Sequence, residues 1–227
     1  MIERLLPAGP DHVVRIRCSE RNDGDFHVEC DPGELSTRRQ ALLGGEWTWL
    51  AQVHEATVVD VDRPGTGAGS AADASVTSAP GAVLAVQTAD CAPIVIVGVG
   101  RVGVAHAGWR GLVAGVIPAT VDAVRGDGDE PLRAMLGPVI RPANYEFGEE
   151  ELARVTAVAG ATARSTTADG RPALDMAAAV RAILRDVGVA EIDDLGIDTA
   201  DERWFSHRVR RDPQRQCTAA RLEVLER

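Results

Sequence analysis

The sequence contains no lysine, so all 24 of its basic side chains other than histidine are arginines. This absence excludes covalent catalysis through a lysine Schiff base. It also excludes a P-loop, because that phosphate-binding motif requires a lysine after its glycines. The glycine-rich stretch at residues 63–73 is therefore interpreted as an ordinary loop. Together with heavy use of alanine and glycine, the missing lysine indicates codon bias more than a function.

Long hydrophobic runs are also missing. The longest apolar run lies near residues 93–99, whereas a membrane-spanning helix needs about 20 apolar residues. The first residues, MIERLLPAGPDHVVRI, lack the long apolar core and the small-residue cleavage site that are typical of a secretory signal. We therefore expect a soluble protein of the cytoplasm, a monomer or a small homo-oligomer.

Cysteines are few, at positions 18, 30, 91 and 217, and no two of them form a CxxC pair. A chain of 227 residues can bury a sufficient core without disulfides. We therefore interpret all four as reduced thiols in a reducing compartment, which agrees with a cytoplasmic location.

Positive charge is in deficit, and the formal net charge is −10. This balance disfavours nucleic acid and anionic membranes as partners. One local exception is a basic cluster, Arg208, Arg210, Arg211 and Arg215. It is either an anion-binding rim or a solvated face.

Composition and periodicity predict one α+β domain over residues 1–227. Hydrophobic residues make up 45% and charged residues 26% of the chain, which is ordinary for a globular domain. No repeat or linker divides it. The expected helices cover residues 32–43, 112–124, 149–159 and 174–188, and Pro118 is expected to kink or shorten the second of them. The expected strands include 47–53 and 56–61, a hairpin about a turn at 98–101, and a last strand in CTAARLEVL. Strands and helices without a regular βαβ rhythm favour the α+β class.

The hairpin brings two potential metal ligands together. APIVIVGVG and RVGVAHAG flank the turn, so paired residues sum to about 199 and His106 lies opposite Pro93. Cys91 lies just beyond the same open end. Because a slip of one residue would turn His106 to the other face, this inference depends on the register.

His54, Cys91 and His106 all fall at strand ends and form the candidate metal site. Two imidazoles and a thiolate suit zinc, and copper competes for the same donors. Three protein ligands with an open fourth position are the catalytic pattern, because structural zinc sites use four. The alternative is that Cys91 is a small core residue and each histidine a hydrogen-bonded structural residue.

Several neighbours of these ligands have two interpretations each. Asp90 either orients the site or accepts a proton, or else it caps a strand end. Arg110 either binds an anion or stacks on Trp109, and Trp109 either stacks on a flat base or packs in the core. Tyr145 and Glu146 either meet a polar ligand or form a solvated lead-in to a helix.

Several motifs together resemble one family. They are QVHEATVVDVD, ADASVTSAPGAVLAVQTADCAPIVIV, GVAHAGWRGLVAGVI, LGPVIRPANYEFGEE, LDMAAAVRAIL and FSHRVRRD. The chain from Thr37 onward is thereby similar to the laccase-domain family, also called multicopper polyphenol oxidase, purine nucleoside phosphorylase/adenosine deaminase, or peptidoglycan editing factor. TADCAP and HAGWRG in tandem are highly specific, whereas QVH alone is weak.

The resemblance implies a metal on His54, Cys91 and His106, the residues that ligand chemistry selects. It also implies a layered α/β/β/α fold with mixed sheets, similar to toxin-type Cys/His hydrolases. The implied activity is phosphorolysis of adenosine, inosine and methylthioadenosine, and deamination of adenosine. The sequence departs from the family at RCSERNDGDFHVECDPGE and at Asp198-Thr199, where Cys-Thr is usual. These departures put the substrate pocket in question more than the metal site.

We therefore predict a zinc-dependent purine nucleoside enzyme whose partners are a nucleoside and phosphate. The predicted catalytic residues are Cys91, His106, Asp90 and Arg110, and the predicted substrate-binding residues are Gln52, Trp109, Tyr145, Arg208 and Arg215. One alternative is a Cys–His hydrolase or amidase that edits peptidoglycan precursors, with Cys91 as nucleophile and His106 as base. Two others are a copper-dependent polyphenol oxidase, which five histidines poorly support, and a non-enzymatic, zinc-stabilised interaction module.

Overall fold

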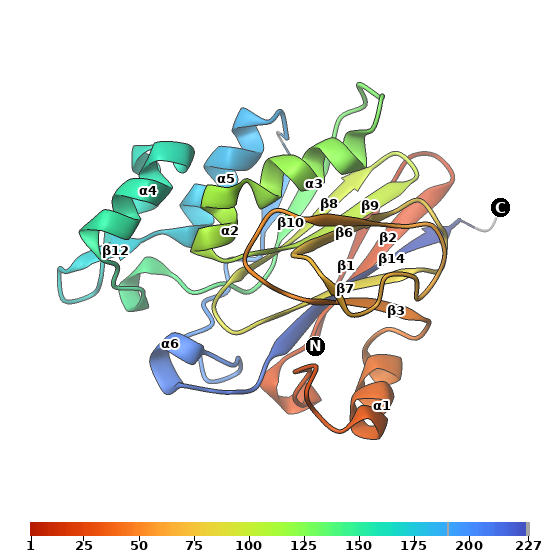
Figure 1. Cartoon of the computed structure of the whole chain (residues 1–227), viewed down its shortest axis with the longest axis horizontal. Helices are drawn as coiled ribbons and strands as arrows, with labels where there is room; N and C mark the ends of the chain where they lie inside the picture. The colour runs from red at the N-terminus through yellow and green to blue at the C-terminus, as the bar shows by residue number, and fades with distance from the viewer. Residues whose placement is uncertain (190, 226–227) are drawn as a thin grey trace.

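The computed structural model describes residues 1–189 and 191–225. Two six-stranded mixed sheets lie face to face between helices (Figure 1). The strands are β1 (Ile2–Pro7), β2 (His12–Cys18), β3 (Trp47–Ala51), β4 (Val58–Val61), β5 (Ser70–Ala71), β6 (Ala74–Thr77), β7 (Val83–Thr88), β8 (Ala92–Gly98), β9 (Arg101–Ala107), β10 (Arg133–Leu136), β11 (Arg164–Thr166), β12 (Pro172–Leu174), β13 (Glu191–Asp194) and β14 (Gln216–Val224).

The first sheet has the order β1-β2-β14-β7-β3-β5, and the second β13-β10-β8-β9-β6-β4. In the first sheet β1, β2, β14 and β7 pair antiparallel, and β3 and β5 are added in parallel at one edge. In the second sheet β10, β8, β9 and β6 pair antiparallel, and β13 and β4 are added in parallel at the two edges. A short pair, β11-β12, stands apart. The helices are α1 (Pro32–Leu42), α2 (Trp109–Ala114), α3 (Val116–Arg125), α4 (Glu149–Ala159), α5 (Met176–Asp186) and α6 (His207–Arg210).

Alternating side chains on the central strands divide the core into three layers. Ile94 and Ile96 of β8 pack with α2–α5, whereas Val95 and Val97 of the same strand pack against the first sheet. The far face of the first sheet is covered by α1, whose Leu35 joins that third core. Figure 1 shows α2–α5 on one side of the sheets and α1 on the other. This order of layers confirms the α+β prediction and the α/β/β/α arrangement.

The register of the β8–β9 hairpin is the one that the sequence predicts. Pro93 pairs with His106, and the turn joins Gly98 to Arg101. Gly98 and the following residues permit this tight turn, and Gly100 has the left-handed φ of 63°. The pairing leaves Cys91 and His106 at the same open end of the hairpin.

The prediction of a single helix over residues 112–124 is wrong, because the chain forms α2 and α3 there instead. The break falls at Gly115, whose φ of 92° is left-handed and which ends α2 and begins α3. Pro118 therefore lies in the first turn of α3, where a missing amide hydrogen breaks no helical bond. The helix is divided by the glycine, and the proline is accommodated.

The other helices agree with the sequence. α4 has the expected bounds, and α1 begins at its expected N-cap Asp31, which accepts hydrogen bonds from two backbone amides. α5 is one turn shorter than expected because Asp175 caps it and it ends at Asp186. No helix in the described residues is long and apolar enough to cross a membrane. All four cysteines have free thiols, as expected.

Candidate metal centre and adjoining cavities

Three separate segments bring the predicted ligands together. His54 follows β3, Cys91 lies between β7 and β8, and His106 lies in β9. One potential ligand atom from each lies within 4.8 Å of the other two. Cys91 Sγ is 3.9 Å from His54 Nε2, and the two imidazole rings meet edge to face with centroids 4.7 Å apart. His54 is exposed, Cys91 half-buried and His106 buried, so the site opens to solvent on one side.

Asp73, which the sequence reasoning missed, holds two of the three ligands. Its Oδ1 lies 2.8 Å from His106 Nδ1, which leaves Nε2 of that ring for a metal. Its Oδ2 accepts hydrogen bonds from the amides of Val53 (3.1 Å) and Glu55 (2.8 Å). These bonds flank His54 and hold it at a φ of 64°, a left-handed conformation that is unfavourable for histidine.

Gly108 leaves space for the ligands to converge. A Cβ atom at this position would lie 2.6 Å from His54 Cδ2 and 3.1 Å from Cys91 Sγ, closer than van der Waals contact permits. Gly108 directly precedes α2. In the structure its missing side chain is a requirement of the site.

The electrostatics of the three residues favour a thiolate. Burial opposes ionisation of Cys91, but His106 and His54 outweigh it and lower the pKa of the thiol to about 6. Burial likewise opposes the imidazolium of His106, but the Cys91 thiolate and Asp73 raise its pKa to about 9. Burial also opposes the Asp73 carboxylate, yet the hydrogen bond from His106 lowers its pKa. A metal ion that replaced the proton on His106 would be stabilised by the same two groups, the Cys91 thiolate and the Asp73 carboxylate.

This donor set fits a divalent metal. Two imidazoles and a thiolate are borderline and soft ligands that suit zinc, and the buried carboxylate behind His106 is the usual second partner of a metal-binding histidine. Within residues 1–189 and 191–225, only these three side chains form a convergent group of at least three His, Cys, Asp or Glu residues. A single group of this size does not fit an enzyme that holds several coppers.

A cavity of about 350 Å³ opens at the ligands, and we name it the triad cavity. This volume lies within the range of small-molecule sites. Its lining comes from β3, β7, the segment before α1 and the segment around α6. The lining residues are His27, Val28, Leu50, Gln52, His54, Gln87, Thr88, Ala89, Cys91, His106, His207 and Arg215.

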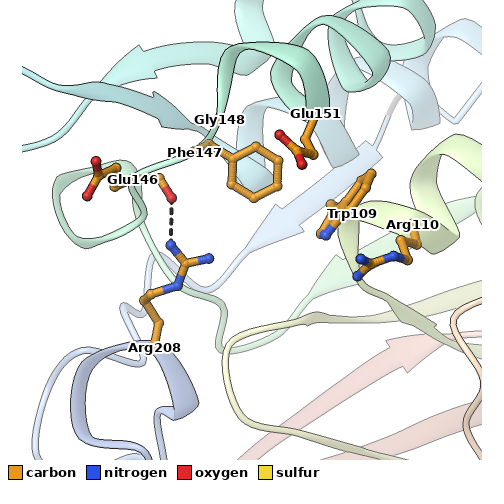
Figure 2. A pocket seen from close by; sticks show the side chains of 7 residues that line it. All are labelled: Trp109, Arg110, Glu146, Phe147, Gly148, Glu151 and Arg208. Carbon is orange, nitrogen blue, oxygen red and sulfur yellow. Dashed lines mark hydrogen bonds between the residues drawn. The ribbon is translucent and has the colours of Figure 1, made fainter.

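A second cavity of about 450 Å³, the arginine cavity, lies beside the first. It is lined by Trp109, Arg110, Glu146, Phe147, Gly148, Glu151 and Arg208. Consecutive residues of α6 line the two cavities: His207 lines the triad cavity and Arg208 the arginine cavity. Figure 2 shows Arg208 and Arg110 on two sides of the arginine cavity, with the rings of Phe147 and Trp109 between them.

The arginine cavity contains two arginines, Arg110 and Arg208, and two glutamates, Glu146 and Glu151. Arg208 donates a 2.6 Å hydrogen bond to the backbone oxygen of Glu146 (Figure 2). The carboxylate of Glu146 is paired instead with Arg171, outside the cavity lining. The Arg110 guanidinium lies 4.4 Å from the centre of the Trp109 ring, so the stacked interpretation of this pair holds in the structure. Stacking still leaves the N–H groups of Arg110 free to meet an anion.

Asp90 and Tyr145 both contact Arg208. Asp90 is buried. It accepts a 2.7 Å bond from the Thr199 hydroxyl and a 2.6 Å bond from the Arg208 amide, and so connects the loop between β7 and β8 to Thr199 and to α6. Thr199, from the segment that departs from the family pattern, thus has a structural partner. Tyr145 is 8% exposed, with the Arg208 guanidinium 4.6 Å from its ring centre. Burial, followed by the Cys91 thiolate, raises the pKa of Tyr145, so its hydroxyl stays protonated.

The remaining predicted substrate-binding residues, Gln52 and Arg215, line the triad cavity and also make hydrogen bonds to the backbone. Gln52 lines the triad cavity, but its amide is bonded to the backbone of Gln87. Arg215 lines the same cavity and donates to nearby backbone oxygens, including that of Pro213 at 2.8 Å. Arg210 donates to backbone oxygens of the 199–204 segment and to Asp212. The basic cluster is therefore split between two cavities and a structural contact.

Known proteins share this fold and sequence. The multi-copper polyphenol oxidoreductase laccase family matches residues 19–223, so the similarity begins before Thr37. A Streptomyces coelicolor purine nucleoside phosphorylase is 42% identical over 190 residues, 78% of either chain. A Mycobacterium tuberculosis purine nucleoside phosphorylase is 36% identical over 199 residues, 82% of this chain and 78% of the relative. A Neisseria meningitidis protein of solved structure, 27% identical, aligns over 98% of each chain with a TM-score of 0.80. This chain therefore belongs to the multi-copper polyphenol oxidoreductase laccase family.

Proposed function

We propose that this protein is a metal-dependent purine nucleoside phosphorylase. The observation that carries the proposal is the group of His54, Cys91 and His106 at the floor of one cavity, beside a second cavity with two arginines. Phosphorolysis needs two substrates of different chemistry, a nucleoside and an oxyanion. Two cavities, one containing the ligand triad and the amides of Gln52 and Gln87, the other containing Arg110 and Arg208, provide for both. The names of the curated relatives agree with this assignment.

In this reaction a phosphate oxygen forms a bond to the ribose C1′ as the bond from C1′ to the purine nitrogen breaks. The electron pair of the broken bond leaves with the purine, which takes up a proton, and ribose 1-phosphate forms. Arg110 and Arg208 would hold the phosphate, because guanidinium groups bind its oxygens through directed N–H bonds. The triad cavity would hold the nucleoside.

His54, Cys91 and His106 would hold the metal, which we propose to be zinc. When bound, zinc would supply Lewis-acid polarisation of a substrate oxygen or activation of water. Asp73 keeps His106 oriented for that role, and Gly108 keeps the ligands close together. Copper suits the same donors, so identification of the resident metal requires direct analysis.

Deamination of adenosine is the second candidate. The observation that favours it is the donor set, because zinc deaminases of nucleobases use a related combination of His and Cys ligands. Those enzymes also use a glutamate to carry protons. No described residue that lines the triad cavity is a carboxylate. We therefore rank deamination below phosphorolysis.

The test is turnover of adenosine in the presence and absence of phosphate, with the products separated by chromatography. We expect adenine from the unmodified protein only with phosphate, and inosine if deamination also occurs. His106→Ala should abolish both products, while His12→Ala, a matched change in β2, should leave them unchanged. Turnover that survives complete removal of metal would refute the metal-dependent mechanism. Adenine formed equally without phosphate would refute phosphorolysis.

We also propose a cytoplasmic, single-domain protein. Four free thiols are compatible with a reducing compartment. The oligomeric state stays a prediction, and size-exclusion chromatography with light scattering would measure it.

A further inference from the structure

Gln87 has an unusual position in the triad cavity. It lies near the end of β7, is only 9% exposed, and lines the cavity four residues before Cys91. The sequence does not distinguish Gln87, because a glutamine before TADC carries no motif of its own. A buried amide at a cavity wall normally has hydrogen-bond partners, because an unpaired polar group costs stability.

The backbone of Gln87 is held rigidly by a neighbouring side chain. Gln52 donates from Nε2 to the Gln87 carbonyl oxygen at 2.8 Å, and its Oε1 accepts from the Gln87 amide, also at 2.8 Å. Gln52 thereby extends the pairing of β3 with β7 beyond the end of β3. The amide nitrogen and the amide oxygen of Gln52 each make one bond in this contact, so Gln52 positions Gln87.

The side-chain amide of Gln87 itself has no hydrogen-bond partner in the described part of the chain. Gln216, another buried glutamine, differs, because its amide both donates to and accepts from the backbone of Phe205. The backbone position of Gln87 is therefore fixed, while its amide is available to a molecule in the cavity. No described residue of the cavity lining is a carboxylate, so a neutral ligand meets no competing acidic acceptor there.

We propose that the Gln87 amide recognises the purine base, and that Gln87 determines which purines are accepted. A primary amide presents one acceptor and one donor side by side, which matches the donor and acceptor on an adenine edge. Rotating the amide by half a turn exchanges the two, and the reversed order matches the oxygen and N–H of hypoxanthine. One residue thus accommodates both 6-amino and 6-oxo purines. This inference rests on the proposed nucleoside function.

The experiment compares the unmodified protein with Gln87→Met, which keeps the length of the side chain and removes its hydrogen bonds. Kd and KM are measured for adenosine, for inosine and for purine riboside, which has no group at C6. We expect Gln87→Met to weaken adenosine and inosine about tenfold each, and purine riboside about threefold. Gln40→Met is the matched control, because the Gln40 amide bonds to the Gly45 oxygen away from both cavities. It should leave all three values unchanged.

A second variant, Gln87→Glu, tests the same inference without loss of polarity. Its carboxylate can only accept hydrogen bonds, so the variant should bind adenosine and inosine more weakly, and to a similar extent, because the donor that completes the match to each base is lost. Equal losses for all three nucleosides in Gln87→Met, or no loss, would overturn the role of Gln87 even if phosphorolysis is confirmed. Conversely, selective loss of nucleoside binding in a protein that turns nothing over would support the role of Gln87 and refute the phosphorylase proposal.

Discussion

Single side chains set the geometry of the metal centre, and Asp73 contributes most. It orients His106 with one oxygen and the chain around His54 with the other. Its side chain is completely buried, so water cannot replace these bonds. The ligand positions thus depend on a carboxylate that would not touch the metal.

Asp73→Asn should lower zinc affinity about 10- to 100-fold, the usual cost of losing the partner of a metal-binding histidine. An asparagine has one acceptor oxygen, so it cannot serve both His106 and the two amides. Affinity is measured by competition with a coloured chelator. Asp60→Asn is the control, because Asp60 is an exposed partner of Arg101. Equal affinities for both variants would exclude an orienting role for Asp73.

Gly108→Ala should disrupt the centre by steric overlap. The added Cβ would lie 2.6 Å from His54, so either the histidine or the start of α2 must shift. We expect destabilisation of about 1–3 kcal/mol, as for overpacking elsewhere, and reduced zinc affinity. Gly128→Ala, whose Cβ would meet nothing closer than 3.5 Å, is the control. Denaturant unfolding and chelator competition report the two effects, and a well-bound metal in Gly108→Ala would contradict the prediction.

At the scale of elements, ion pairs connect the outer strand of the second sheet to its helices. Asp194, at the end of β13, accepts hydrogen bonds from Arg141, after β10, and pairs with Arg181 of α5. Its side chain is 18% exposed. Burial alone would raise the pKa of Asp194, but Arg141, the Gly196 amide and Arg181 lower it below the ordinary value.

Asp194→Asn should cost about 1.5–3 kcal/mol of stability at pH 7, the range for hydrogen bonds to charged groups. Because the folded-state pKa is lowered, this stability is present above the unfolded-state pKa of about 4 and is lost as the pH falls through the folded-state value. The difference between the two proteins should therefore shrink in acid. Urea unfolding at several pH values measures it. Asp193→Asn, at an exposed pair with Arg4, should cost less than about 0.5 kcal/mol.

For the whole molecule, the stacked sheets and the metal centre are largely independent. The three hydrophobic cores lie between and outside the sheets, whereas the ligands lie at strand ends beside open cavities. The fold therefore has a core that does not include the metal ligands, unlike a small zinc-stabilised module.

Removing metal with a chelator should abolish nucleoside turnover and leave the fold intact, and added zinc should restore turnover. Activity and far-UV circular dichroism are followed on the same sample. Turnover that survives chelation but is lost on alkylation of Cys91 would favour the Cys–His hydrolase instead. Unfolding on chelation would favour the interaction module.

The sequence by itself determined the local parts of this protein. The β8–β9 register, which brings Cys91 and His106 together, follows from one turn and two apolar runs. The bounds of α4 and the start of α1 follow from their end residues. These features depend on neighbours in the chain, and periodicity, caps and turns report such contacts directly.

Only the tertiary structure decided the partners from distant segments. Asp73 lies 33 residues before His106, Gln52 lies 35 before Gln87, and Thr199 lies 109 after Asp90. Among 34 acidic residues, nothing in the sequence distinguishes Asp73. The order of strands in two stacked sheets determines which loops meet, and that order arises from long-range burial. Hydrophobic patterns show that a residue is buried, but they do not show which residue it is buried against.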